Sequence, residues 1–170
     1  MNLPAPIKLF LSGERGAGKS FVIRQVLRCG HGLQAGGFFT IPIFQPRGFA
    51  LFDLLSGKQA PIGIFRSNGE LAPQPEGFEI LGVKALREAR KNRVELLVMD
   101  ELGFLELEAP LFRREVLSAL NYFPLVLGAI KSRGNPFLTQ IRQTPGVRVW
   151  KIDARNREEI LGRILKIIVA

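Results

Sequence analysis

The fold of this chain follows from one short stretch, Gly13-Glu14-Arg15-Gly16-Ala17-Gly18-Lys19-Ser20. It fits G-x-x-x-x-G-K-[ST], the pattern of a phosphate-binding P-loop. Its glycines let the backbone curl so that successive N–H groups face a polyphosphate. In such a loop the Lys19 ammonium reaches the β- and γ-phosphates, and the Ser20 hydroxyl can bind Mg²⁺. We therefore predict that all eight residues, together with the adjoining Phe21, bind a nucleotide.

The residues on either side of this stretch support the prediction. Residues 7–11 (IKLFL) have the apolar character of a buried strand that enters the loop, and residues 21–27 (FVIRQVL) have the pattern of a helix that leaves it. Phosphate would then lie at the helix N-terminus, where free N–H groups favour anions. The alternative is a glycine-rich turn without a ligand, but the strand before it and the helix after it favour the P-loop.

Composition indicates one compact intracellular domain. The 170 residues are 46% hydrophobic, which excludes a disordered chain and predicts a single domain over residues 1–170. Residues 1–6 show no secretory signal, and no apolar run reaches the ~18 residues that span a membrane. The single cysteine, Cys29, cannot form an intramolecular disulfide, which favours the reducing cytoplasm. Cys29 and the nearby His31 are not expected to be catalytic.

The net charge of +9 and the pI of 10.4 favour anionic partners, which include nucleotides and nucleic acids. No zinc-finger, helix-turn-helix or RNA-recognition pattern accompanies the basic residues. A solvated basic face is therefore the favoured interpretation, and any nucleic-acid binding is expected to be weak. The residues that cluster on two expected helices are Arg87, Arg90, Lys91, Arg93, Arg113 and Arg114.

Between residues 37 and 77 the pattern predicts antiparallel structure. Short strands are expected at 37–43, 49–55 and 61–65, and their close spacing permits only hairpin connections. Pro42 is expected near a sheet edge or a bulge, because proline has no N–H for the ladder. Residues 67–77 contain two prolines and two glycines and are expected to form a surface loop.

The rest of the chain alternates between helices and strands. Helices are expected at 79–91, with Ile80, Val83 and Leu86 at helical spacing, and at 110–122, with Phe112, Val116 and Leu120. Strands at 123–130 and 147–152 and a closing helix from 158 follow. We predict an α/β fold of three layers, a P-loop NTPase with a mostly parallel central sheet and an antiparallel hairpin extension.

A second motif with chemical content lies at residues 94–101 (VELLVMDE). An apolar run that ends in Asp100 is typical of a central parallel strand that carries a carboxylate to the carboxyl edge of the sheet. That position suits a Mg²⁺ ligand in a P-loop NTPase, so Ser20 and Asp100 are the predicted metal ligands. Glu101 can orient and deprotonate an attacking water. The alternative for Glu101 is a helix-capping or surface carboxylate.

Over nearly its whole length the chain resembles the small nucleoside-triphosphatases first described in thermophiles, whose vertebrate member is called the cancer-related nucleoside-triphosphatase. The most specific block is Asp100-Glu101-Leu102-Gly103-Phe104-Leu105-Glu106-Leu107, which matches the family's D-E-I-G-x-M-E-L. The resemblance implies Mg²⁺-dependent hydrolysis of NTP to NDP and phosphate, with little discrimination among bases. The other matching positions are the P-loop, Gly37-Phe38-Phe39-Thr40, Gly48-Phe49, Asp53, Ser56-Gly57, Phe78-Glu79 and Asn156-Arg157-Glu158.

Three positions depart from the family pattern. Phe21 replaces a second hydroxyl residue, residues 41–44 lack the usual acidic and arginine positions, and Phe104 replaces a basic residue. The loss of the second hydroxyl weakens an expected α-phosphate contact. Together the departures favour nucleotide binding over fast hydrolysis.

The sequence thus predicts hydrolysis of Mg-NTP, with Lys19 stabilising phosphoryl charge and Glu101 positioning water. Asn156 and Arg157, after the last strand, are candidates for contacting the base or ribose. One alternative is a small-molecule or nucleoside kinase, which would need an acceptor pocket and a mobile lid, for which Arg133 and Arg142 are candidates. Another is a nucleotide-dependent RNA-binding module, for which the basic excess is the only support.

Overall fold

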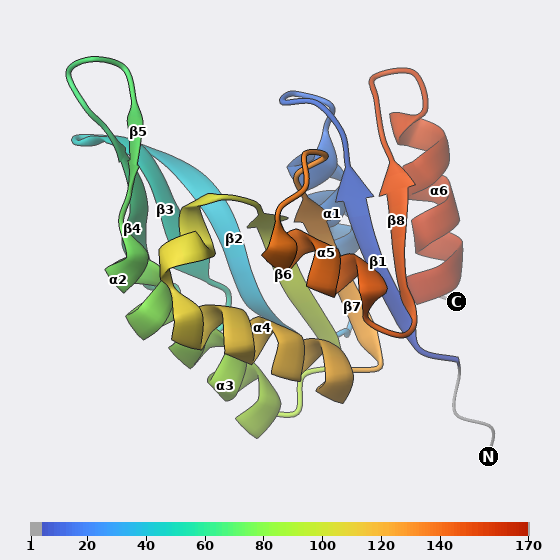
Figure 1. Cartoon of the computed structure of the whole chain (residues 1–170). Helices are drawn as coiled ribbons and strands as arrows, with labels where there is room; N and C mark the ends of the chain where they lie inside the picture. Colours follow the sequence, from blue (N-terminus) through green and yellow to red (C-terminus); the bar gives the residue numbers. More distant parts are fainter. Residues whose placement is uncertain (1–4, 170) are drawn as a thin grey trace.

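A computed structural model describes residues 5–169 and shows an eight-stranded sheet with helices on both faces (Figure 1). The order of the strands in the sheet is β5-β4-β3-β2-β6-β7-β1-β8. The predicted fold class, three layers with a mostly parallel sheet and an antiparallel extension, is confirmed. The strands are β1 (Ile7–Ser12), β2 (Ala35–Phe44), β3 (Arg47–Asp53), β4 (Gln59–Phe65), β5 (Leu71–Pro73), β6 (Leu96–Leu102), β7 (Leu125–Ile130) and β8 (Val147–Lys151).

The half of the sheet formed by β2, β6, β7, β1 and β8 is parallel throughout. Its central strands β6, β7 and β1 are almost wholly buried, which explains their near-continuous apolar sequences. Because these strands run in one direction, the residues that follow β1, β6 and β7 meet at the same edge of the sheet. This edge therefore brings together the P-loop and the carboxylates predicted from residues 94–101.

The other half, β2 to β5, is antiparallel, as the hairpin spacing predicts. Pro42 lies in the part of β2 beyond Phe38, where the ladder with β6 has ended and only β3 pairs with it. The prediction of a surface loop over residues 67–77 was wrong for part of that segment. A turn in which Gly69 N–H donates to the Arg66 carbonyl leads into the edge strand β5, whose short length and terminal Pro73 conceal it in the sequence.

The helices form two layers. On one face lie α1 and α6, which bury side chains such as Val22, Ile23 and Ile164. On the other lie α3, α4 and α5, with Phe112 and Phe137 in the larger core. Among the described helices, none is long and apolar enough to cross a bilayer. The helices are α1 (Lys19–Cys29), α2 (Pro75–Gly77), the π-helical turn η1 (Phe78–Gly82), α3 (Val83–Lys91), the 3₁₀ turn η2 (Leu105–Glu108), α4 (Pro110–Tyr122), α5 (Pro136–Gln143) and α6 (Arg157–Ile168).

Two helices differ from the sequence prediction. Ile80 is at helical spacing from Val83 and Leu86, but it is 67% exposed whereas those two side chains are buried. The π-helical turn changes which residues face the sheet, so that Phe78 and Leu81 are buried instead. The sequence analysis did not predict α5. This helix begins where the Asn135 side chain accepts a hydrogen bond from the Leu138 N–H at 2.9 Å.

Candidate active site

The P-loop connects β1 to α1 and has the conformation that phosphate binding requires. Gly16 and Gly18 have φ values of +82° and +100°, in the left-handed region that favours glycine. The Ala17 N–H donates to the Glu14 carbonyl at 3.0 Å, which closes the turn. Gly18 caps α1 without a side chain, so no side-chain acceptor occupies the first N–H groups of the helix. These amides are free to bind an anion.

Lys19 is the first residue of α1, and its side chain is buried within the loop. Its ammonium donates to the carbonyls of Gly13 at 2.7 Å and Glu14 at 3.0 Å. The loop therefore holds the charge in place with two of the three N–H donors. The third N–H donor remains for a phosphate oxygen, which would also be attracted by the positive charge of the ammonium.

Ser20 and Asp100 lie side by side, as the motif spacing predicts. The Ser20 hydroxyl is 2.9 Å and 3.1 Å from the two Asp100 carboxylate oxygens. Asp100 is fully buried, and burial raises its pKa to about 6, an effect that the Ser20 hydrogen bond opposes and the nearby Glu101 charge reinforces.

A hydroxyl and a carboxylate are the oxygen ligands that Mg²⁺ prefers. Across residues 5–169 no three His, Cys, Asp or Glu side chains form a metal-binding group. In nucleotide sites Mg²⁺ usually binds one or two protein oxygens together with phosphate and water. The Ser20–Asp100 pair is therefore a suitable donor set for Mg²⁺.

Glu101 has an unusual backbone conformation that turns its side chain into the site. Its φ of +76° is in the left-handed region, which is uncommon for residues other than glycine. The pairing of β6 with β7 shifts register between Met99 and Leu102, so Glu101 lies at a bulge. The Thr40 hydroxyl donates to the Asp100 carbonyl at 2.9 Å and fixes the peptide before Glu101. Strain held in this way is a feature of functional sites.

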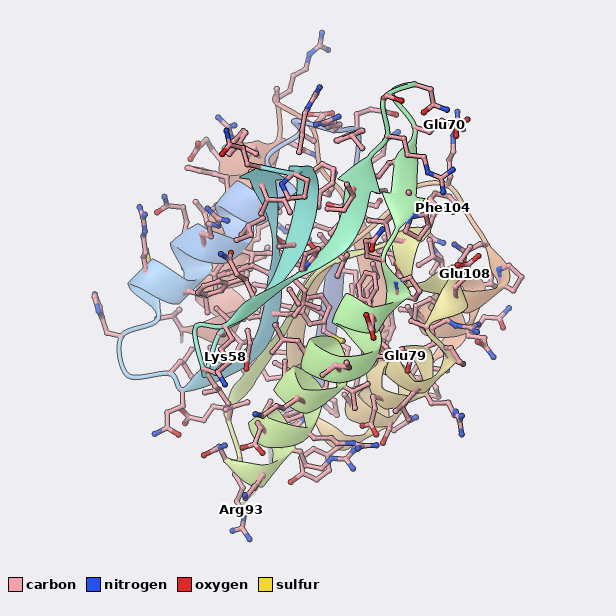
Figure 2. The ribbon with its side chains drawn as sticks, turned by 90° about the vertical axis from the view of Figure 1, so that its left-hand side faces the viewer. Lys58, Glu70, Glu79, Arg93, Phe104 and Glu108 are labelled. Carbon is pink, nitrogen blue, oxygen red and sulfur yellow. The ribbon has the colours of Figure 1, made fainter. Side chains whose placement is uncertain are left out.

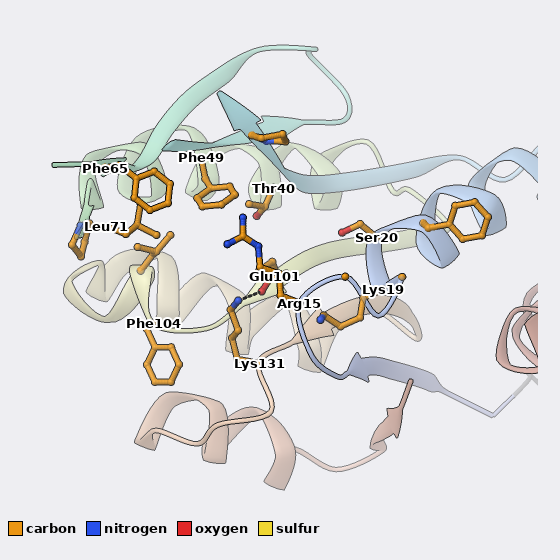
Figure 3. A pocket seen from close by; sticks show the side chains of 16 residues that line it. Arg15, Lys19, Ser20, Thr40, Phe49, Phe65, Leu71, Glu101, Phe104 and Lys131 are labelled. Atoms are coloured by element: carbon orange, nitrogen blue, oxygen red, sulfur yellow. Dashed lines mark ion pairs between the residues drawn. The ribbon is translucent and has the colours of Figure 1, made fainter. Parts of the chain in front are cut away.

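Lys131 lies beside Glu101, a contact that the sequence analysis did not predict. The Lys131 ammonium is 2.6 Å from the Glu101 Oε1 atom (Figure 3). Lys131 is the first residue after β7, so the parallel sheet brings it to the edge that carries Glu101. Arg142 on α5 donates to the Lys131 carbonyl at 2.7 Å and fixes the backbone there. The sequence carries one signal for this contact, which is a basic residue directly after an apolar strand.

Gly103 connects these groups to a buried carboxylate. The Gly103 N–H donates to the side chain of Glu106, and the Gly103 carbonyl accepts from the Asn135 amide at 2.9 Å. A side chain at Gly103 would collide with Lys131, because its Cβ would lie 2.6 Å from the Lys131 Cγ. Burial raises the pKa of Glu106 to about 7. The Glu106–Gly103–Asn135 contacts therefore hold the backbone against which the Lys131 side chain packs.

One cleft, with a volume of about 700 Å³, is lined by Lys19, Ser20, Glu101 and Lys131. The buried Asp100 does not line it but contacts it through Ser20. Figure 3 shows Lys19 and Ser20 at one end of it, Phe49, Phe65 and Leu71 at the other, and Arg15, Glu101 and Lys131 between them. The cleft thus has a polar end at the P-loop and an apolar end on the antiparallel half of the sheet. The lining residues are Arg15, Gly16, Gly18, Lys19, Ser20, Phe21, Thr40, Pro42, Phe49, Phe65, Leu71, Pro73, Glu101, Phe104, Leu105 and Lys131.

The two candidates for contacting the base or ribose occupy different positions. The Arg157 guanidinium lies 5.1 Å from the centre of the Phe21 ring and its side chain packs against Gly18, so Arg157 adjoins the P-loop. Asn156 uses its amide within its own loop, accepting from the Asp153 N–H at 2.8 Å and donating to the Lys151 carbonyl at 3.0 Å. Contact of either residue with a nucleoside stays a prediction.

The basic cluster on α3 lies away from the cleft. Arg87 forms an ion pair with Glu115 at 2.8 Å, and Arg90 packs over the Tyr122 ring at 4.3 Å, so both are engaged with α4. Figure 2 shows Arg93 at the lower end of the molecule, well below Phe104, which lines the cleft. These contacts fit the interpretation of a solvated basic face.

Comparison with known proteins agrees with this geometry. A family model described as NTPase matches residues 8–165. The chain belongs to this NTPase family. It is 30% identical to the nucleoside-triphosphatase THEP1 of Thermotoga petrophila, over 95% of this chain and 93% of that protein. The resemblance to small P-loop nucleoside-triphosphatases is thereby confirmed.

Two solved structures of relatives have the same fold. The crystal structure of THEP1 from Aquifex aeolicus is 29% identical and superposes with a TM-score of 0.78, covering 96% of this chain and all of that one (100%). The solution structure of a human cancer-related nucleoside triphosphatase is 26% identical with a TM-score of 0.76, covering 95% of this chain and 97% of that one. The NTPase fold therefore extends over almost the entire chain.

Proposed function

We propose that this chain is a Mg²⁺-dependent nucleoside-triphosphatase that hydrolyses NTP to NDP and phosphate. The single observation that carries the proposal is that Glu101, the P-loop and Ser20 line one cleft, with the buried Asp100 bonded to Ser20. The names of the relatives, nucleoside-triphosphatases, support hydrolysis over the alternatives. We extend the proposal to one domain over residues 1–170, because a single sheet includes strands from Ile7 to Lys151.

The binding roles follow from the chemistry of each side chain. The P-loop amides and the Lys19 ammonium would bind the β- and γ-phosphates and stabilise charge that develops during transfer. Ser20 and Asp100 would hold Mg²⁺, which when bound neutralises phosphate charge. Arg157, stacked on Phe21 beside the loop, is suited to contact the nucleoside end. A cytoplasmic location is part of this proposal and is supported by the lone, exposed Cys29.

Glu101 would act on the attacking water. Its carboxylate accepts a proton as the water oxygen bonds to the γ-phosphorus, and the bond from that phosphorus to the β,γ-bridging oxygen breaks, releasing NDP and phosphate. The ion pair with Lys131 keeps the Glu101 carboxylate in one position at the bulge. A positioned general base of this kind typically increases the reaction rate by a factor of about 10²–10⁴.

The test is a comparison of Glu101→Gln with Asp100→Asn. Because Glu101 acts in the transition state, Glu101→Gln should bind Mg-ATP about as well as the parent and release phosphate at least ~100-fold more slowly. Asp100→Asn should lose affinity and Mg²⁺ dependence together, because it removes a metal ligand. Calorimetry measures binding, and a phosphate-release assay with several NTPs measures turnover.

The matched control is Glu108→Gln, which changes an exposed carboxylate on the nearby η2 turn (Figure 2). It should leave both binding and turnover unchanged. Parental turnover in Glu101→Gln would make Glu101 a structural residue. NDP formation that begins only when an acceptor is added, with the phosphoryl group recovered on that acceptor, would favour the kinase alternative instead.

As replacements for hydrolysis, the two alternatives have less support. A kinase would need a mobile lid that carries an arginine, and residues 131–146 are the candidates. Arg142 instead lies on helix α5 and donates a hydrogen bond to the Lys131 carbonyl. Nucleic-acid binding rests on charge alone, and we expect only weak association that disappears at moderate ionic strength. Repeating the phosphate-release assay with RNA at physiological salt tests that alternative directly.

A further inference from the structure

We propose that the apolar end of the cleft is an acceptor site, which binds a nucleoside and passes the γ-phosphoryl group to one of its hydroxyls. The inference rests on the proposed function, because it uses the same phosphate site and the same base, Glu101. It adds a second substrate and a second activity. The residues that carry it are the aromatic pair Phe49 and Phe65 with the arginines beside them.

The apolar end is built from side chains of the antiparallel hairpins. Phe49 and Phe65 have ring centres 6.0 Å apart at an angle of 55°. The Arg15 guanidinium is 5.9 Å from the centre of the Phe49 ring, and the Arg47 guanidinium is 4.8 Å from that of Phe65. Leu71 on the edge strand β5 completes the wall (Figure 3). Aromatic rings with adjacent guanidinium groups are a surface on which a heteroaromatic base stacks.

These side chains differ from the aromatic residues of the core. Phe38, Phe78 and Phe112 are at most 1% exposed, whereas Phe49 and Phe65 are only partly buried and line the cleft. The wall is therefore apolar surface that the described side chains leave open to a ligand. Gly63 contributes to its shape, because a Cβ there would lie 3.1 Å from the methyl groups of both Leu71 and Leu105. Apolar walls with a few convergent polar groups are typical of small-molecule sites.

The direction of phosphoryl transfer places this wall on the acceptor side. The attacking and leaving oxygens of such a reaction lie roughly in line, on opposite sides of the phosphorus. Glu101 and Lys131 lie between the apolar end and the P-loop residues Lys19 and Ser20 (Figure 3). If the nucleophile enters from the Glu101 side, the leaving NDP extends away from the wall, toward Phe21 and Arg157. The donor nucleotide therefore leaves the apolar end free for a second molecule.

The reaction balances without a further reactant. The acceptor hydroxyl oxygen bonds to the γ-phosphorus of the NTP, and the bond to the β,γ-bridging oxygen breaks. The hydroxyl proton passes to the Glu101 carboxylate. The products are NDP and a nucleoside monophosphate, and water competes for the same position because the cleft is open to solvent.

The experiment supplies γ-labelled ATP with Mg²⁺ and, separately, millimolar adenosine, guanosine, cytidine or uridine. Chromatography then measures labelled nucleoside monophosphate and labelled inorganic phosphate in the same reaction. We expect nucleoside monophosphate from at least one of the four. We also expect Phe65→Ala to lower the ratio of transfer to hydrolysis about tenfold at subsaturating nucleoside, the size of effect typical of a lost base–aromatic stack.

Leu71→Ala tests the same wall from β5 and should lower the ratio in the same direction, so the proposal does not depend on the folding of one variant. Phe44→Ala is the matched control, since Phe44 ends β2, is 78% exposed and does not line the cleft.

Phosphate release without nucleoside monophosphate from any nucleoside would overturn the acceptor site and leave the hydrolase proposal standing. Transfer that is unaffected by both wall variants would overturn the assigned location. Absence of any phosphate release would contradict the hydrolase proposal instead.

Discussion

The two halves of the sheet contribute to one cleft in different ways. The parallel half supplies charged and polar groups at the ends of β1, β6 and β7, whereas the antiparallel half supplies apolar area from Phe49, Phe65 and Leu71. Phosphate binding requires particular residues at particular spacings, so the first contribution is visible as a sequence motif. Apolar area can be built from many residues on several strands. Only the folded sheet shows which of them line the cleft.

The first prediction tests whether nucleotide affinity belongs to the parallel half. Lys19→Ala should weaken Mg-ATP binding about 100-fold, roughly 3 kcal/mol, because a charge-assisted contact to phosphate is lost. The fold should persist, since Lys19 bonds only to carbonyls of its own loop. Calorimetry measures the affinity, and circular dichroism checks the fold.

Lys58→Ala is the control from the antiparallel half, because Lys58 is exposed in the turn between β3 and β4 (Figure 2). It removes the same charge from the whole protein and should leave the affinity unchanged. Unaltered affinity in a folded Lys19→Ala variant would contradict the P-loop assignment. An equal loss in both variants would show that net charge, and not the loop, governs binding.

The same contrast explains what the sequence could and could not predict. The P-loop, the Asp100 strand and helix 110–122 each carry a strong local pattern, and all three elements are present. The strand β5 was missed because its three residues lie among glycines and prolines, and their strand structure comes only from pairing with β4. The ion pair between Glu101 and Lys131 joins the end of β6 to the residue that follows β7. The sequence places a basic residue after an apolar strand, but the pairing of β6 with β7 is needed to show which side chain it meets.

The second prediction concerns η2, which connects the two halves. Leu105 packs near Gly63 of the antiparallel half, while Glu106 holds Gly103 beside the parallel half. Burial raises the Glu106 pKa from 4.5 to about 7, so between these values the folded state holds a proton that the unfolded state has lost. The Glu106 contribution to the free energy of unfolding therefore falls as pH rises from about 4.5 to 7.

Glu106→Gln removes this titration and keeps an oxygen that can accept from Gly103. At pH above the folded pKa it should raise the free energy of unfolding by about 2 kcal/mol, less than the full pKa shift implies because the new amide N–H₂ also needs partners. Below the unfolded pKa the gain should vanish. Urea unfolding of the parent and the variant across this pH range measures the gain in the free energy of unfolding. The titration of Asp100 affects both proteins and cancels in the difference between them. Glu108→Gln, on the exposed side of the same turn, should change nothing; an equal gain there would point to surface charge.

The last prediction concerns Lys131, the residue that the sequence analysis missed at the boundary between the polar and apolar ends of the cleft. Lys131→Met keeps much of the side-chain length but removes the ammonium that lies 2.6 Å from Glu101. The Glu101 carboxylate then loses the partner that fixes its position at the bulge. Since positioning affects the reaction more than ground-state binding, kcat should fall about tenfold, ~1.4 kcal/mol of barrier, with little change in ATP affinity.

Two further variants decide what such a loss means. Lys131→Arg keeps the charge and should recover part of the turnover. Arg133→Met removes a cation from an exposed position two residues farther along the chain and should have no effect. Parental turnover in Lys131→Met would show that the bulge and the Thr40 hydrogen bond are enough to position Glu101. In that case the function of the parallel half would depend on β6 and the P-loop alone, and the ion pair would contribute only to the shape of the cleft.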